Sequence, residues 1–400
     1  MSPSPAQPKV AFVAGANGVS GNAIIEYLIR RSKEEWSKIV VSSRSPLKSF
    51  WQDPRVHFIA LDLSSSVEDV VKKLQPLCTD VTHAYFVSYV HSDDFTALKA
   101  LNVPLFENFL HGIDTVAGDS LKSVCLQTGG KASHYGVHLG PPAEVPLHEG
   151  IPRYDDEGYN FYYPQEDLLF KIHAQRKWTW NVIRPMAIIG YTPSKNGMSE
   201  ALTLALYILV CKELGEVPEF PGNEYFYNSV DDSSYAQGVA DMTIWATTHP
   251  QTRNQAFNHI NGDTFVWKYF FANLCKHFGA EAPIITDWPK GGDGNSKSKV
   301  LLETWAQDPR KKEAWDRVCD KFGGNKDTFA WGSWAFLDWV SQKTWPTLSS
   351  CAKARSFGWT RVDDTFSTWI ETYRMFENAG ILPPNHVTNP PIAAPGSVES

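Results

Sequence analysis

The sequence predicts an α/β fold, in which a doubly wound parallel sheet is followed by a smaller, mainly helical C-terminal portion. Up to about residue 195, apolar runs short enough for strands alternate with segments of helical spacing, and beyond that point helical spacing dominates. Strands that alternate with helices form parallel sheets with right-handed crossovers. The runs that predict strands are 9–15, 38–42, 56–61, 82–89, 123–128 and 180–185.

The first run ends in glycine and is followed by a predicted helix over 21–32, in which Ile24, Ile25 and Leu28 share one face. A second helix is expected at about 67–76. The helices expected in the C-terminal portion are 198–215, 233–248, 264–278, 301–320 and 327–340. The expected divisions of the chain are a flexible N-terminus (1–8), a sheet domain (9–195), a helical portion that is not fully independent (196–382) and a flexible tail (383–400).

The composition is ordinary for a globular enzyme and argues against several kinds of partner. The net charge of −7 and the lack of a Lys/Arg cluster argue against nucleic acid. The longest apolar run, 201–211, is about half of a membrane span, and the N-terminus lacks the features of a signal peptide. Six scattered cysteines have no metal-ligand spacing. We therefore expect reduced thiols, no metal and a cytoplasmic location.

The turn after the first strand reads Gly15-Ala-Asn17-Gly18-Val19-Ser-Gly21. In such a turn the first glycine permits a tight bend, the second lets backbone approach a pyrophosphate, and the third lets the helix pack closely on the strand. Free N–H groups at the helix N-terminus then bind the phosphates. Because the motif follows a strand and opens a helix, it predicts a Rossmann-type dinucleotide site.

The ends of the next two strands predict which dinucleotide binds. An acidic residue at the end of the second strand favours NAD, but this chain has Ser43 and Arg44 there, which suit a 2′-phosphate. We therefore expect NADPH. Asp62, after the third strand, is expected beside the adenine, and Leu63 is also expected at the cofactor. An alternative interpretation of Asp62 is the N-cap of the following helix.

Two later segments carry a distinctive pattern. Lys131 ends the segment Leu-Gln-Thr-Gly-Gly-Lys after the fifth strand, and Asn-Phe-Tyr-Tyr at 160–163 follows about 30 residues later, while no convincing Tyr-x-x-x-Lys pair stands at the expected distance. Together with other segments, this order resembles the progesterone 5β-reductase/iridoid synthase-like (PRISE) branch of the extended short-chain dehydrogenases/reductases, over about residues 9–382. The other segments that look like this family are 80–83, 180–185, 256–258, 261–263, 267–268 and 357–359.

The resemblance implies that Lys131 and Tyr162 form the catalytic pair and also contact the cofactor. In this family, hydride passes from NADPH to the β-carbon of an enone, and the tyrosine hydroxyl donates a hydrogen bond to the carbonyl oxygen on which charge develops. The nearby ammonium lowers the pKa of the tyrosine. Tyr163 is a rival for the catalytic role, and the alternative for Tyr162 is a buried core tyrosine.

The same mapping places further residues around the cofactor and the substrate. Tyr89 and Tyr163 are expected to line the substrate pocket, although ordinary packing would also explain such positions. Two departures from the family pattern stand out: an apparent two-residue insertion after Lys131, and Tyr89 where tryptophan is more usual. Either would reshape the pocket. The remaining residues expected at the cofactor are Ser88, Thr128, Gly129, Pro185 and Ile188.

These observations predict an NADPH-dependent reductase of an α,β-unsaturated carbonyl compound that is small and mostly apolar. Direct reduction of a ketone or aldehyde, a non-redox cyclase, lyase or isomerase, and a cofactor-binding regulatory protein are the alternatives. Nine of the fifteen tryptophans lie between Trp288 and Trp369, which predicts either a core of large side chains or an aromatic-walled pocket. The sequence leaves the oligomeric state open, and a homodimer is compatible with it.

Overall fold

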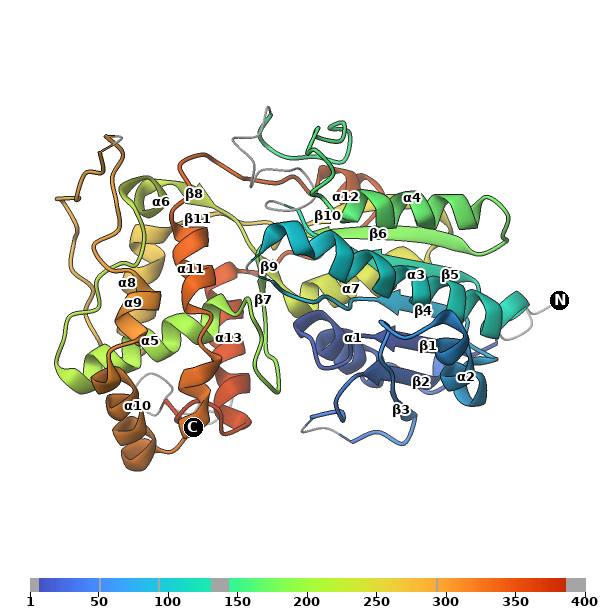
Figure 1. The fold of residues 1–400 in the computed structure, drawn as a ribbon, viewed down its shortest axis with the longest axis horizontal. Helices are drawn as coiled ribbons and strands as arrows, with labels where there is room; N and C mark the ends of the chain where they lie inside the picture. The colour runs from blue at the N-terminus through green and yellow to red at the C-terminus, as the bar shows by residue number, and fades with distance from the viewer. Residues whose placement is uncertain (1–6, 50–51, 93, 131–143, 293, 386–400) are drawn as a thin grey trace, which may run out of the picture. The chain divides into compact units, whose positions relative to one another are not determined.

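The computed structural model describes residues 7–385 apart from 50–51, 93, 131–143 and 293, and contains a seven-stranded sheet (Figure 1). The strand order is β10-β6-β5-β4-β1-β2-β3, and every neighbouring pair is parallel. The predicted fold class is confirmed. The strands are β1 (Lys9–Ala14), β2 (Trp36–Ser43), β3 (Val56–Ala60), β4 (His83–Phe86), β5 (Ser123–Gln127), β6 (Thr179–Pro185) and β10 (Gln255–His259).

Helices cover both faces of the sheet, which explains why its strands are nearly continuous apolar runs. Along β1, Ala11 and Val13 face the helix pair α1 and α7, whereas Val10 and Phe12 face α2, α3 and α4. All four side chains are buried. The sheet is therefore the middle of three layers. The helices are α1 (Val19–Ile29), α2 (Val67–Cys78), α3 (Leu98–Ala117), α4 (Tyr162–His173) and α7 (Ala236–Thr248).

The strand order reverses between β1 and β4, because the chain runs from β1 outward to β2 and β3 and then returns to the other side of β1. Ligands of open α/β sheets bind outside the carboxyl ends of the strands at such a switch point. β1 ends at Ala14, immediately before the glycine turn, and β4 ends at Phe86. The glycine turn therefore lies at the position where this architecture binds ligands.

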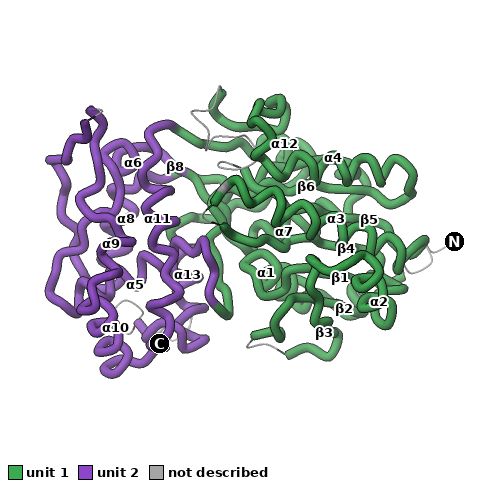
Figure 2. Tube along the Cα trace, in the orientation of Figure 1, with its two compact units in different colours: residues 1–194, 232–264, 346–368 green, residues 195–231, 265–345, 369–400 purple. Residues whose placement is uncertain are grey.

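The chain forms two compact units, each built from several segments (Figure 2). It leaves unit 1 after Ser194, close to the boundary expected at residue 195, but it returns to this unit twice. Whether the units correspond to cofactor-binding and substrate-binding portions stays a prediction. Unit 1 comprises 1–194, 232–264 and 346–368. Unit 2 comprises 195–231, 265–345 and 369–400.

The strand β10 lies inside the stretch that we predicted as mainly helical. Its sequence, Gln-Ala-Phe-Asn-His, lacks a long apolar run, and its pairing with β6 makes it a strand. The Asn258 backbone N–H donates to Glu149 at 2.6 Å, so a side chain takes the place of a further strand at this edge of the sheet. Unit 1 also contains β7 (Ile188–Ile189), β9 (Ser234–Tyr235) and α12 (Ala352–Ser356).

The described part of unit 2 is mainly helical, as expected. The predicted helix 301–320 is two helices, because Asp308 caps a new helix that begins at Pro309. Trp315 and Trp369 are fully buried and belong to the core. The elements of unit 2 are α5 (Glu200–Leu214), α6 (Glu224–Asn228), β8 (Val230–Asp231), β11 (Phe265–Val266), α8 (Trp267–His277), α9 (Leu302–Ala306), α10 (Pro309–Phe322), α11 (Trp334–Ser341) and most of α13 (Thr365–Asn378).

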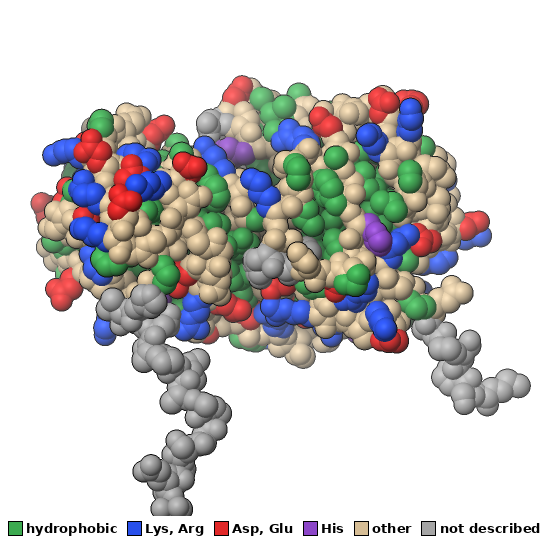
Figure 3. Space-filling view, turned by 90° about the horizontal axis from the view of Figure 1, so that it is seen from below, with side chains coloured by type: hydrophobic (Ala, Val, Ile, Leu, Met, Phe, Trp, Pro, Cys, Tyr) green, Lys and Arg blue, Asp and Glu red, His purple; other side chains and the backbone are tan. Residues whose placement is uncertain are grey.

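The surface carries charges of both signs. On the face shown in Figure 3, Lys/Arg and Asp/Glu side chains are interspersed, which is not the continuous basic field of a nucleic-acid-binding surface. Among the residues that the structure describes, no helix combines the length and apolar character needed to cross a bilayer.

Candidate active site

The glycine turn is built so that side chains cannot replace its first and third glycines. Gly15 has a φ of 101°, and a Cβ on it would lie 2.9 Å from backbone atoms of Val87 and Ser88. A Cβ on Gly21 would lie 2.1 Å from the Gly15 carbonyl oxygen. The turn therefore packs directly against the segment that follows β4. Ser88, which was expected at the cofactor, lies beside the first glycine.

The N-terminus of α1 is open for an anion. The helix begins at Val19, its N-cap residue Gly18 supplies no side-chain cap, and its first turn has no acidic residue. The first N–H groups of such a helix lack intrahelical partners, and the helix dipole favours a negative charge there. The Gly18 N–H donates to the Gly15 carbonyl at 3.0 Å, which closes the turn. These features fit the pyrophosphate of a dinucleotide.

The ends of β2 and β3 bring Arg44 and Asp62 into electrostatic contact. Hydrogen bonds from the Ser64 N–H (3.0 Å) and hydroxyl (2.8 Å) hold the pKa of Asp62 below its usual range, and the Arg44 charge adds to this effect. The N-cap interpretation of Asp62 is wrong, because Ser66 caps α2 by accepting from Asp69 N–H at 3.1 Å. Leu63 is buried.

Tyr162 begins α4 and lies beside the end of β5. A Cβ on Gly129 would be 3.2 Å from the Tyr162 hydroxyl, so the Tyr162 ring packs closely against this glycine. Thr128 donates its N–H to the Ile183 carbonyl at 2.9 Å, which extends the pairing of β5 with β6. The Thr128 hydroxyl is buried and has no hydrogen-bond partner among the described residues. Lys131 and the apparent insertion after it lie outside the described residues.

Tyr163, the rival of Tyr162, is engaged elsewhere. Its hydroxyl accepts the Tyr154 backbone N–H at 2.9 Å, and the Arg153 guanidinium lies 4.8 Å from its ring centroid. The side chain is buried, and this burial raises its pKa. Phe161, two residues before Tyr163, stacks on Tyr89 with 6.0 Å between ring centroids. The loop after β4 and the start of α4 therefore meet through aromatic rings.

The segment after β6 carries backbone strain. Ala187, between Pro185 and Ile188, has a φ of 43°, a region that residues with a Cβ rarely adopt. The Pro185 carbonyl accepts the Gly130 N–H at 3.0 Å, and Ile188 pairs with Ser234 in β7–β9. Strained backbone concentrates at ligand sites, and this segment was expected to hold the nicotinamide.

Sequence reasoning missed a charge network behind Tyr162, centred on the buried Glu166. Glu166 accepts from Arg184 of β6 at 3.0 Å and from Arg153 at 3.2 Å, and Arg153 also pairs with Asp167 at 2.7 Å. Glu166 is 2 % exposed and Arg184 is 8 % exposed. The one signal in the sequence is the arginine that follows two apolar residues, Val-Ile, near the end of β6. The network fixes α4, and thereby Tyr162, against β6.

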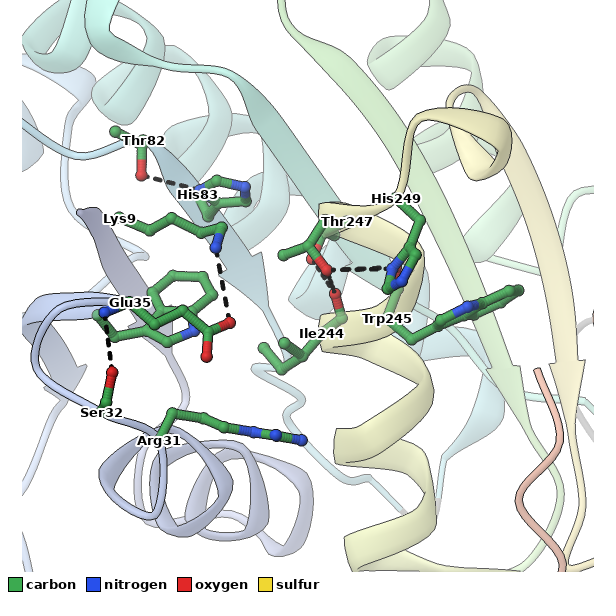
Figure 4. Close-up of polar contacts among 12 residues, drawn as sticks. Lys9, Arg31, Ser32, Glu35, Thr82, His83, Ile244, Trp245, Thr247 and His249 are labelled. Carbon is green, nitrogen blue, oxygen red and sulfur yellow. Dashed lines mark hydrogen bonds and ion pairs between the residues drawn. The ribbon is translucent and has the colours of Figure 1, made fainter. Parts of the chain in front are cut away.

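A cavity of about 620 Å³ lies near the other end of α1 and contains none of the predicted site residues. Its lining comes from the C-terminal parts of α1 and α7 and from the segment after α12, and it includes Arg31, Trp245 and His249. Figure 4 shows these side chains near Lys9 and His83, at the amino ends of β1 and β4. This cavity is therefore remote from the glycine turn, which adjoins the carboxyl end of β1.

Comparison with known proteins agrees with this architecture. A family profile described as a PRISE-like Rossmann-fold domain matches residues 11–330. The chain belongs to the PRISE-like family. This result confirms the resemblance inferred from the motifs.

Curated relatives span nearly the whole chain. A short-chain dehydrogenase, gsfE, from Penicillium aethiopicum is 42% identical over 94% of this chain and 100% of its own length. The (S)-8-oxocitronellyl enol synthase ISY1 of Nepeta racemosa is 32% identical over 92% of each chain. A 3-oxo-Δ4,5-steroid 5β-reductase of Arabidopsis thaliana is 31% identical over 94% of each chain. These relatives and the fold support an oxidoreductase.

Solved structures show the same fold at low identity. UDP-glucose 4-epimerase of Thermotoga maritima, solved with UDP-glucose, superimposes with a TM-score of 0.61 at 15% identity, over 92% of this chain and 99% of that chain. The two chains therefore share the Rossmann-type fold.

Proposed function

We propose that this PRISE-like protein is an NADPH-dependent reductase of an α,β-unsaturated carbonyl compound that is small and mostly apolar. The observation that carries the proposal is the position of Tyr162, whose hydroxyl adjoins Gly129 at the carboxyl end of β5. The Arabidopsis relative supports the substrate class, because its name describes reduction of a steroid in which a ketone is conjugated with a C=C bond.

The residues present fit a nicotinamide dinucleotide. Three features support this: the open N-terminus of α1, the glycines whose Cβ atoms would fill the turn, and the buried Thr128 hydroxyl without a partner among the described residues. Ser43 and Arg44 favour the 2′-phosphate over a free ribose hydroxyl. NADPH would supply hydride when bound. We therefore assign pyrophosphate binding to the turn and phosphate selection to the end of β2.

Tyr162 stabilises the charge that develops on the substrate oxygen. When hydride adds to the β-carbon of an enone, electrons move to the carbonyl oxygen, and the Tyr162 O–H donates a hydrogen bond to it. Lys131 is proposed to bring an ammonium close to this hydroxyl and thereby favour the phenolate. Tyr89, stacked on Phe161, is proposed to form one wall of the substrate pocket.

The experiment compares two adjacent tyrosines. We expect Tyr162→Phe to lower turnover at least about tenfold with little change in NADPH affinity, because one transition-state hydrogen bond is lost. The matched control, Tyr163→Phe, removes the hydroxyl that accepts the Tyr154 N–H, so it should lower stability by about 1 kcal/mol and retain most activity.

NADPH oxidation is followed at 340 nm with matched enones, saturated ketones and aldehydes, and the products are identified by mass spectrometry. A saturated ketone product from an enone supports transfer to the β-carbon, whereas an alcohol indicates direct carbonyl reduction. NADPH binding without oxidation by any substrate would favour the non-redox alternative. If Tyr162→Phe and the unsubstituted protein have equal turnover, Tyr162 is not the catalytic tyrosine.

We also propose a cytoplasmic location. All six cysteines are buried free thiols, and none of them forms a disulfide. Burial raises the pKa of Cys78 and Cys351 to about 12, so both remain protonated and unreactive at neutral pH. Reduced thiols are typical of a reducing compartment.

A further inference from the structure

Asn17 lies in the glycine turn, yet its side chain contacts the loop that follows β2. Its Nδ2 atom lies 3.0 Å from the Ser43 hydroxyl, 3.1 Å from the Ser45 hydroxyl, 3.3 Å from the Ser45 carbonyl and 3.0 Å from the Pro46 carbonyl. Its Oδ1 atom accepts the Lys48 backbone N–H at 3.2 Å. Because an amide nitrogen carries two hydrogens, the four acceptors share them. One side chain thus contacts both ends of the loop.

Among the residues that the structure describes, few other contacts anchor the loop. Leu47 packs against the hydrophobic core on the α1 face, and the Ser43 hydroxyl donates to the Ser45 carbonyl. Arg44 and Ser45 are exposed. The charge of Arg44 nevertheless acts on Asp62, after the neighbouring strand β3. The loop conformation that Asn17 stabilises therefore keeps the Arg44 guanidinium near the carboxyl ends of β2 and β3.

We propose that Asn17 determines the preference for NADPH as a positioning residue, by holding loop 43–48 in the conformation in which Ser43 and Arg44 bind the 2′-phosphate. The inference rests on the proposed function, since it presumes that this loop binds that phosphate. Binding a ligand to a flexible loop costs conformational entropy, because the loop becomes ordered. When Asn17 orders the loop beforehand, this cost is avoided and the affinity for NADPH rises. NADH lacks the 2′-phosphate and gains nothing from the ordered loop. The effect of Asn17 is therefore selective between the two cofactors.

The first test measures dissociation constants of the full-length Asn17→Ala protein for NADPH and NADH by cofactor fluorescence. We expect NADPH affinity to fall about tenfold, because the hydrogen bonds of the amide to the loop are lost, and NADH affinity to change by less than about twofold. Adenosine 2′,5′-bisphosphate, which carries the 2′-phosphate without the nicotinamide, should lose affinity in parallel with NADPH.

Ser45→Ala is the matched control. It removes one hydroxyl acceptor but leaves the Ser45 and Pro46 carbonyls and the Ser43 hydroxyl within reach of the amide. We expect its ratio of NADPH to NADH affinity to stay within about twofold of the original. If Asn17→Ala does not fold, Pro46→Gly loosens the loop from its own side, because glycine has more backbone freedom. Like Asn17→Ala, Pro46→Gly should reduce the ratio of NADPH affinity to NADH affinity.

A second readout needs no cofactor chemistry. Trypsin cleaves after exposed arginine and lysine, and Arg44 and Lys48 are both exposed in this loop. We expect Asn17→Ala to increase the cleavage rate at these two sites several-fold in the absence of cofactor, with the rate elsewhere unchanged. Cleavage fragments are identified by mass spectrometry, so a general loss of stability is distinguished from loosening of the loop.

The outcomes separate the inference from the proposed function. If the unsubstituted protein binds NADH as tightly as NADPH, the proposed cofactor is wrong and the inference falls with it. If NADPH is preferred but Asn17→Ala weakens both cofactors equally, Asn17 acts on the shared pyrophosphate and the inference alone is overturned. An unchanged ratio together with unchanged cleavage would also overturn it.

Discussion

Replacing Gly21 by alanine should damage the fold and the cofactor site together. The added Cβ would lie 2.1 Å from the Gly15 carbonyl oxygen, whereas ordinary contact begins at 3.4 Å, and 2.8 Å from the Gly15 carbonyl carbon. Both atoms are backbone at the junction of β1 and α1, so no side chain can rotate away. Overpacking of this kind costs roughly 1–3 kcal/mol even where side chains can adjust. We expect a cost of about 3 kcal/mol for Gly21→Ala.

Gly18→Ala provides the comparison within the same turn. Its Cβ would lie 3.3 Å from the Gly15 carbonyl oxygen, a contact that a small shift relieves, and the residue is exposed. The new methyl group would point to where backbone is expected to approach the pyrophosphate. We therefore expect Gly18→Ala to keep the thermal stability of the unliganded protein and to weaken NADPH binding.

The assay is thermal unfolding with and without NADPH, with cofactor affinity measured by fluorescence. Gly21→Ala should lower the melting temperature of the unliganded protein by several degrees and reduce cofactor binding, whereas Gly18→Ala should affect binding alone. If Gly21→Ala is as stable as the unsubstituted protein and binds NADPH normally, the close approach of α1 to β1 is not required, and the steric argument fails.

Two further predictions concern charge. Arg44→Glu should weaken NADPH far more than NADH, because a carboxylate replaces the guanidinium at the 2′-phosphate, and an unchanged preference in a binding assay would refute the phosphate role. Burial lowers the pKa of His83 and of His259 to about 3, so each stays neutral in the folded protein while the unfolded chain binds a proton below about pH 6.5. Stability should therefore fall as pH decreases from about 6.5 towards 3, by up to about 1.4 kcal/mol per pH unit for each histidine. The free energy of unfolding, measured by urea denaturation between pH 7 and 5, should change less with pH for His259→Leu than for the unsubstituted protein. An equal change with pH would contradict the claim that His259 stays neutral in the folded protein.

The sheet could be predicted from sequence wherever a strand is a continuous apolar run. The strands β1 to β6 lie within a few residues of the predicted runs, because burial on both faces requires apolar residues at every position. β10 could not be predicted in this way, since three of its five residues are polar, and its strand structure depends on backbone pairing with β6 and on the bond from the Asn258 N–H to Glu149. Sequence reasoning also missed α3, whose interior contains Pro104.

The candidate site was predictable in part. The spacing of the glycines and the strand before them indicate a dinucleotide turn, and the steric need for Gly15 and Gly21 agrees with that interpretation. The sequence pattern could not show whether Tyr162 or Tyr163 is the catalytic tyrosine, because the two adjacent residues differ only in the tertiary contacts that they make. The contact that distinguishes them, from Tyr154 to the Tyr163 hydroxyl, depends on how the preceding loop folds back.

The charge network around Glu166 has a consequence for how such a site can be re-engineered. Glu166 stands four residues after Tyr162, where a Tyr-x-x-x-Lys enzyme carries its lysine, and its two oxygens are occupied by Arg153 and Arg184. A lysine introduced there would face two guanidinium groups in a site that excludes water, so transplanting the common motif would create repulsion rather than a proton relay. In this chain, the surroundings of position 166 on α4 thus stabilise a negative charge. Any cation that assists Tyr162 has to arrive from another segment.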